Sequence, residues 1–270
     1  MRVGGKPLAA AVDAIDRRGV LLLYPLANRP DPPSLWGVLH PRAAMRWAWD
    51  ETGDDRVVEL WHLRGRLAED RRVVYTKWFR GRATFVSRPV FRALLSAVRA
   101  ARPPEQGLSP EARALLELLE ESSPRSTREL RRGAGLEGKL LERAFVRAMS
   151  ELWSRLLVVG AGEVDDGAFP SLAVGATRLL YEDLYDESAR PDRPSRADDE
   201  ARLARALGAS PALRRAFDAT MASLGAAPPR PSPPEPARPS TAGRRAPARH
   251  SSSGGASAAA PRVTLRKSSR

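Results

Sequence analysis

Three basic side chains follow one another at intervals of four residues in the middle of the chain: Lys139, Arg143 and Arg147. Because an α-helix completes a turn in about 3.6 residues, this spacing predicts a row of positive charge on one helix face. Arginines in such a row can bind DNA phosphates or the edges of guanine bases in the major groove. The alternative is a solvated helix face whose charge Glu142 and Glu151 balance.

The segment around this row is basic, since residues 122–155 hold eight basic side chains and four acidic ones. This excess favours DNA contact over a merely solvated face. We therefore add Arg128 and Arg131, which lie on the helix predicted just before the row, to the expected contacts with double-stranded DNA.

A second basic cluster, in residues 71–88, is interleaved with aromatic residues. Its predicted hairpin turns at Arg80 and Arg82, and we expect these two side chains to contact phosphate. The aromatic rings could stack on bases. We favour the alternative that they belong to the hydrophobic core: Tyr75, Trp78 and Phe79.

Other kinds of chemistry find little support. Cysteine is absent, and histidine occurs only at the scattered positions His40, His62 and His250, so we expect neither a metal nor another cofactor. The apolar run at residues 20–24 is far too short to cross a bilayer, and the N-terminus lacks the apolar stretch of a secretory signal. A cytoplasmic protein without membrane contact is predicted.

Positive charge is concentrated at the two ends of the sequence. The chain has a net charge of +13, of which residues 1–108 carry +8 and residues 226–270 another +8. Such an excess suggests nucleic acid as the partner. Arginine supplies 41 of the 45 basic residues, so a compositional bias of the source genome is an alternative explanation.

The periodicity of apolar residues divides the chain into four segments. Residues 1–107 form a Trp-rich region of mixed α/β structure, with predicted helices at 7–18, 56–68 and 87–100 and strands at 20–24, 73–79 and 83–86. Residues 177–225 contribute closing helices at 197–207 and 210–224. Residues 226–270 contain nine prolines and no aromatic residue, which predicts a disordered basic tail.

Residues 108–176 have the element order of a winged helix-turn-helix. Ser109 caps a first helix that ends near Glu121, and Ser126 with Glu129 forms a capping box for a short second helix. A third helix is expected over residues 137–154, with an apolar face that points inward: Leu141, Ala144, Phe145, Ala148 and Leu152. Strands at 156–161 and 168–174 complete a hairpin. The fold class is therefore α+β, with this module packed against the N-terminal region.

Three stretches of the chain resemble a known family when they are taken in order: RRGVLLLYPLANRPDPPSLW, VVYTKWFRGRATFVS and LSPEARALLELLEESSPRSTRELRRGAGLEGKLLERAFVRAMSELWSRLLVVG. Together they resemble AlkZ-related bacterial proteins, which are distant relatives of the AlkZ DNA glycosylases. The resemblance covers roughly residues 7–187. It implies a fold assembled from winged-helix modules and an association with DNA repair or regulation.

The resemblance also implies a place to look for catalysis. In AlkZ-type glycosylases a glutamine-hydrophobic-glutamine (or aspartate) motif near the N-terminus positions the attacking water. The most similar position here reads Leu22-Leu23-Tyr24-Pro25, and the single glutamine of the chain, Gln106, lies in a proline-flanked linker. Leucine side chains cannot position water or stabilise an oxocarbenium ion. The resemblance therefore implies a related scaffold that lacks the catalytic motif.

We accordingly predict a non-enzymatic DNA-binding protein. One alternative is a DNA glycosylase for alkylated or crosslinked bases that uses a different carboxylate, such as Asp13 or Asp50. The other is a winged helix that binds a protein partner. Acidic residues at the expected wing tip support this second alternative, because they would repel DNA phosphate: Glu163, Asp165 and Asp166.

Overall fold

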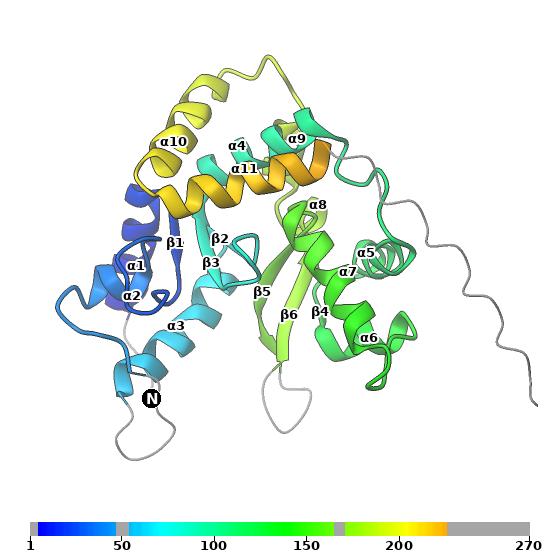
Figure 1. The fold of residues 1–270 in the computed structure, drawn as a ribbon, viewed down its shortest axis with the longest axis horizontal. Coiled ribbons are helices and arrows are strands. Elements are labelled where there is room, and N and C mark those ends of the chain that lie inside the picture. The colour runs from blue at the N-terminus through cyan, green and yellow to red at the C-terminus, as the bar shows by residue number, and fades with distance from the viewer. Residues whose placement is uncertain (1–4, 47–53, 165–170, 226–270) are drawn as a thin grey trace, which may run out of the picture. The chain divides into compact units, whose positions relative to one another are not determined.

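The structure is a computed structural model that describes residues 5–46, 54–164 and 171–225. Short segments of this part pair into an antiparallel sheet of six strands with the order β1-β3-β2-β5-β6-β4 (Figure 1). Helices surround the sheet, so the protein is a mixed α+β protein. The predicted tail at 226–270 lies outside the described residues.

Residues 5–87 build one half of the sheet. Their elements are α1 (Gly5–Arg18), β1 (Val20–Leu22), α2 (Leu35–Leu39), α3 (Asp55–Asp70), β2 (Val73–Thr76) and β3 (Thr84–Ser87). The helices expected at 7–18 and 56–68 are confirmed within two residues at each end. Strands β1 and β2 are shorter than expected, whereas β3 has the expected length. Strand β1 is apolar throughout because both faces are covered: Leu21 belongs to the core under α1 and α3, whereas Val20 and Leu22 belong to the core on the opposite face.

Residues 110–176 build the other half. Their elements are α5 (Pro110–Glu121), β4 (Arg125–Ser126), α6 (Thr127–Gly133), α7 (Glu142–Ser154), β5 (Val158–Val164) and β6 (Ser171–Ala176). The Ser109 hydroxyl accepts a hydrogen bond from the Ala112 amide, and Ser126 with Glu129 forms the expected capping box. Strands β5 and β6 pair as the expected hairpin, whose tip at residues 165–170 lies outside the described residues.

The third helix of this half is shorter than the sequence pattern predicts. Helix α7 begins at Glu142 and not at residue 137, because Gly138 has φ +91°, a left-handed value that an α-helix cannot continue through. Leu141, which was expected to face inward, is 40% exposed at the start of the helix. Lys139 therefore precedes the helix and does not share a helix face with Arg143 and Arg147.

The two halves repeat one order of elements: helix, strand, helix, helix, strand, strand. In each half the first strand pairs with the last, as β1 does with β3 and β4 with β6, and the last pairs with the middle one. Strands β2 and β5 join the halves where Tyr75 lies opposite Gly160. A glycine is required at this position, because a Cβ atom on residue 160 would lie 1.8 Å from Cδ1 of Tyr75.

The remaining helices cover the sheet face that is opposite α1 and α3. They are α4 (Arg88–Ala101), α8 (Thr177–Leu180), α9 (Glu182–Ser188), α10 (Arg196–Gly208) and α11 (Pro211–Gly225), so the expected closing helices at 197–207 and 210–224 are confirmed. On α11 Leu213 and Leu224 are buried, and Phe217 and Met221 are partly buried against the same core. Figure 1 shows α10 and α11 at one end of the sheet.

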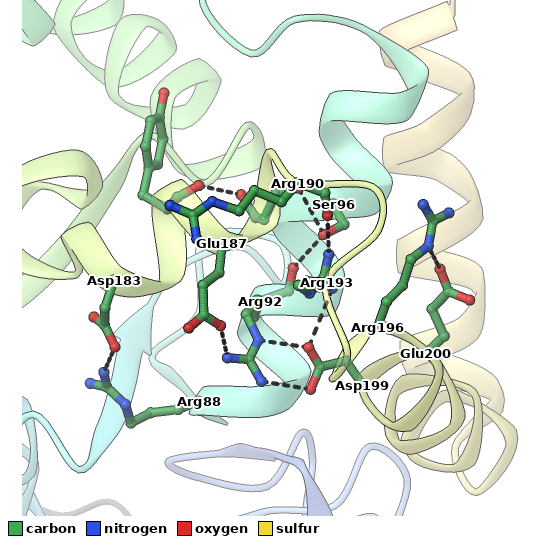
Figure 2. Close-up of polar contacts among 12 residues, drawn as sticks. Arg88, Arg92, Ser96, Asp183, Glu187, Arg190, Arg193, Arg196, Asp199 and Glu200 are labelled. Atoms are coloured by element: carbon green, nitrogen blue, oxygen red, sulfur yellow. Dashed lines mark hydrogen bonds and ion pairs between the residues drawn. The ribbon is translucent and has the colours of Figure 1, made fainter.

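An ion-pair network fixes α10 to α4 (Figure 2). Asp199 of α10 is 1% exposed and accepts hydrogen bonds from Nε and Nη2 of Arg92 on α4 at 2.6 and 3.1 Å. A second guanidinium, that of Arg193, lies 3.3 Å from Oδ2 of Asp199. Arg92 also forms an ion pair with Glu187 of α9. One buried carboxylate therefore joins two arginines from two different segments.

The tryptophans of the N-terminal region differ in their burial. Trp36 and Trp78 are buried at 1% and 4% exposure, whereas Trp61 is 40% exposed on α3 beneath the guanidinium of Arg64. Trp47 and Trp49 lie outside the described residues. None of the described helices combines the length and the apolar character that a membrane crossing requires.

Candidate nucleic-acid interface

The two arginines of α7 lie on its solvent side. Arg143 and Arg147 are exposed, whereas Phe145, Ala148 and Leu152 of the same helix are buried. Residues four apart in a helix share one face, so the two guanidinium groups project from neighbouring turns. Within the described part of the chain neither arginine has a carboxylate partner. They are free cations on an ordered helix, as the prediction of a DNA contact requires.

The two DNA contacts predicted on α6 differ in their burial. Arg128 is exposed. Arg131 is half-buried and donates a bidentate hydrogen bond to Glu142, and its guanidinium lies 4.0 Å from the ring centre of Phe145. The hydrogen bond from Arg131 lowers the pKa of the Glu142 carboxyl. Arg131 therefore links α6 to α7, and its charge is largely neutralised.

The segment between β2 and β3 presents its arginines and buries its rings. Arg80 and Arg82 are exposed, whereas Tyr75, Trp78 and Phe79 are no more than 4% exposed. The interpretation that these rings belong to the core is therefore confirmed. The guanidinium of Arg80 lies 5.6 Å from the ring centre of Phe79, so the buried ring supports the exposed charge.

A cavity of about 690 Å³ separates this β2–β3 segment from α7 and α11, and we call it the α7–α11 cavity. It brings together two of the predicted contacts, Arg80 and Arg131, which are 51 positions apart in the sequence. It also holds Lys77, which belongs to the predicted basic cluster at residues 71–88 but is not one of the two contacts expected there. The residues that line the cavity, all of them in the described part of the chain, include no carboxylate.

Two polar groups of the α7–α11 cavity lack partners in the described structure. Trp78 is 4% exposed, and its Nε1 is buried without a hydrogen-bond acceptor. Lys77 is half-buried and has no carboxylate partner among the described residues. Burial, together with the nearby Arg64 guanidinium, lowers the pKa of the Lys77 ammonium. An anionic group in the cavity would supply the partner that Lys77 lacks, so this cavity is suited to a ligand with negative charge.

The residues considered for glycosylase chemistry lie elsewhere. Leu22 and Leu23 are each 1% exposed in the core, so their side chains cannot reach a substrate. Gln106 is exposed in the linker, where its backbone carbonyl accepts a 2.7 Å hydrogen bond from Arg155. Asp13 is exposed on α1, away from the lining of the α7–α11 cavity, and Asp50 lies outside the described residues.

The acidic residues of the β5–β6 hairpin are only partly described. Glu163 lies near the end of β5 and forms an ion pair with Arg64 of α3. Its position next to the hairpin tip agrees with the expectation, but its carboxylate is paired with Arg64 of the first half of the protein and is therefore not free to repel DNA phosphate. Asp165 and Asp166 lie outside the described residues. Among the described residues no group of three histidine, aspartate or glutamate side chains could hold a metal ion.

The fold and the site define a mixed α+β protein that presents unpaired arginines beside a cavity lined by rings and cations. Residues 6–171 match the family described as AlkZ related, and the chain belongs to that family. This membership relates it to DNA glycosylase-like proteins. No curated protein and no solved structure matches the chain. Helices α8 to α11 follow the matched region.

Proposed function

We propose that this protein binds double-stranded DNA without enzymatic activity, and that residues 108–176 form a winged helix-turn-helix whose third helix, α7, contacts the DNA. The observation that carries the proposal is the pair Arg143 and Arg147, two exposed guanidinium groups without carboxylate partners on adjacent turns of α7. Membership of the AlkZ-related family supports DNA as the partner.

The element order supports the winged-helix assignment. Helices α5, α6 and α7 are followed by the β5–β6 hairpin, and β4 adds a third strand beside β6. We propose that residues 5–87 form a second winged helix, since they repeat this order and this strand pairing. The third helix of that unit, α3, packs against β5 through the Arg64–Glu163 ion pair. Helix α7 has the more accessible basic face, and we therefore assign DNA contact to it.

The lining of the α7–α11 cavity supports a non-enzymatic role. Hydrolysis of a glycosidic bond requires a carboxylate or an amide that positions water beside the anomeric carbon. The described residues that line this cavity are apolar, hydroxyl-bearing or basic, and none has a carboxylate or amide side chain. A nucleic acid that reaches the cavity would contact basic and hydroxyl side chains that can bind it. It would meet no carboxylate or amide side chain among these lining residues that could position water.

Charge reversal on α7 tests the DNA contact. Arg143→Glu combined with Arg147→Glu is expected to lower affinity for a short duplex by about 30-fold or more, since each arginine contact contributes about 1–3 kcal/mol. The dependence of log K on log salt is expected to flatten by about 1.8, because each lost phosphate contact removes about 0.9. Fluorescence anisotropy at several salt concentrations measures both quantities.

The matched control is Arg113→Glu with Arg190→Glu, which changes the net charge equally at two exposed arginines of α5 and of the loop after α9. It is expected to weaken binding much less. Equal losses in the two double variants would contradict a local contact at α7 and would leave only general electrostatic attraction. Circular dichroism checks that both variants are folded.

An assay for base release tests the absence of catalysis. With protein in excess over DNA that contains N7-methylguanine, we expect no more free base than in protein-free controls. A glycosylase would release base in a single turnover, and loss of its charge-stabilising group would slow that release by about 10²–10³. Release that is abolished by Asp13→Asn or Asp50→Asn would overturn the non-enzymatic proposal.

A second candidate function is contact with a protein partner through the same region. Large apolar side chains are exposed where α7 begins: Leu140 at 96%, Leu141 at 40% and Val146 at 53%. Contiguous exposed apolar residues are typical of protein interaction sites. Unchanged DNA affinity after charge reversal on α7 would favour this candidate.

A further inference from the structure

The α7–α11 cavity combines aromatic surfaces with cations that have no anionic partner. Phe145 and Trp153 of α7 line it together with Trp78, and Lys77 and Arg80 enter from the β2–β3 segment. Helix α11 supplies a wall of small residues: Ala216, Ala219, Thr220 and Ser223. The charge of Arg131 is balanced by Glu142, so the cations available to a ligand are Lys77 and Arg80.

The unpaired cation indicates what a ligand must carry. Trp78 lines the cavity, but its Nε1 is buried away from solvent, so the indole offers a ligand its ring and not its N–H. Lys77 is half-buried and lacks a carboxylate partner in the described structure. A ligand that brings an anionic group would supply that partner. A cationic ligand would be repelled, because the described lining contains no carboxylate.

We infer that the α7–α11 cavity binds one nucleotide unit, with its base against the aromatic residues and its phosphate on Lys77 and Arg80. The inference rests on the proposed function, and it adds a site for a nucleotide that is not stacked in a duplex. Every base has a flat face that can stack on an aromatic ring. The volume of about 690 Å³ lies in the ordinary range for small-ligand sites.

The same chemistry is present in a free nucleotide and in an unstacked nucleotide of a strand, so the experiment has an arm for each. The full chain is titrated with a deoxynucleoside 5′-monophosphate, with the corresponding deoxynucleoside and with inorganic phosphate, and tryptophan fluorescence reports binding. The monophosphate is expected to bind about tenfold or more tightly than either fragment.

In the second arm, a single-stranded oligonucleotide with a terminal fluorescent base is expected to bind and to compete with the monophosphate. Competition assigns the site to strand ends, and binding of the monophosphate alone assigns it to free nucleotides.

Two variants separate the cavity from the remainder of the protein. Ala219→Trp places a large ring in the cavity and is expected to weaken binding of the monophosphate by about tenfold or more. Ala222→Trp adds the same ring to an exposed position of α11 that does not line the cavity, and it is expected to have no effect. Lys77→Gln is expected to weaken the monophosphate more than the deoxynucleoside, because only the former carries the charge.

Failure of this inference and failure of the proposed function give different results. If duplex affinity depends on Arg143 and Arg147 but neither monophosphate nor single strand binds, the nucleotide site is wrong and DNA contact by α7 stands. If Ala219→Trp leaves nucleotide binding intact, the ligand is bound elsewhere and the inference is overturned. If Ala219→Trp instead changes the oligomeric state, the cavity is a protein contact and the inference is likewise overturned.

Discussion

Replacement of Gly160 with valine is expected to destabilise the protein by about 3 kcal/mol or more, the upper range for overpacking of a core. Even the first side-chain atom at this position would lie 1.8 Å from the ring of Tyr75, and that ring has little room to move. Tyr75 is fully buried, with the ring centre of Phe85 5.2 Å away and that of Trp153 6.5 Å away. Urea denaturation measures the change in the free energy of unfolding.

The control for this variant is Gly208→Ala at the end of α10. No heavy atom outside its own chain segment lies within 4 Å of a Cβ added there, so we expect stability to stay the same or to rise by about 0.4–1 kcal/mol. If Gly160→Val were as stable as Gly208→Ala, strands β2 and β5 would not be joined at Tyr75. The single six-stranded sheet would then be wrong.

The junction at Gly160 matters for the proposed nucleotide site because it holds the two halves in register. Arg80 belongs to the first half and Arg131 to the second, yet both line the α7–α11 cavity. The β2–β5 pair lies between these halves. A variant that weakens the junction is therefore expected to lose the cavity before it loses the separate cores under α3 and α7.

Much of the second half could be predicted from its sequence because its signals are local. The capping box at Ser126 and the N-cap at Ser109 each involve residues three apart, and both occur as expected. Apolar periodicity likewise placed α5 within a residue of its observed bounds. The sequence pattern extends α7 too far toward the N-terminus because Leu141 continues the apolar face, whereas Gly138 takes a backbone conformation that interrupts the helix.

The repeated architecture could not be predicted because it depends on pairing between distant strands. Strand β1 has three residues and pairs with β3 more than sixty positions later, and α2 has only five residues. Elements this short give no reliable periodicity. The repeat of the two halves is therefore visible only in the order of strand pairing.

The candidate site was only partly predictable, for a related reason. Arg143 and Arg147 were identified because both lie on one helix, where spacing alone determines a shared face. Lys77 belongs to the predicted basic cluster at residues 71–88, but the sequence does not indicate that it lies beside α7 and α11, which follow it by more than sixty positions. The small residues Ala219 and Ser223 give no sequence signal of a cavity wall.

Replacement of Asp199 with alanine is expected to cost about 3–5 kcal/mol, because it removes the anionic partner of two buried guanidinium groups. The Asp199 side chain is 2% exposed, and those of Arg92 and Arg193 are 16% and 4% exposed. Arg92 would keep Glu187, whereas Arg193 would keep no carboxylate partner among the described residues. The total stability of a domain is about 5–15 kcal/mol, so such a loss is a large fraction of it.

The matched control for Asp199→Ala is Glu200→Ala, at the next position of α10. Glu200 pairs with Arg196 at the surface, where both side chains are about half exposed, and such pairs contribute about 0–1 kcal/mol. Thermal and urea unfolding of the two variants therefore compare a buried carboxylate with an exposed one on the same helix turn. Equal losses would contradict the role of the buried network.

The Asp199→Ala variant is also expected to bind nucleotide more weakly, under conditions in which it is still folded. Helix α10 leads directly into α11, which forms one wall of the α7–α11 cavity, so a loosened α10 disturbs that wall.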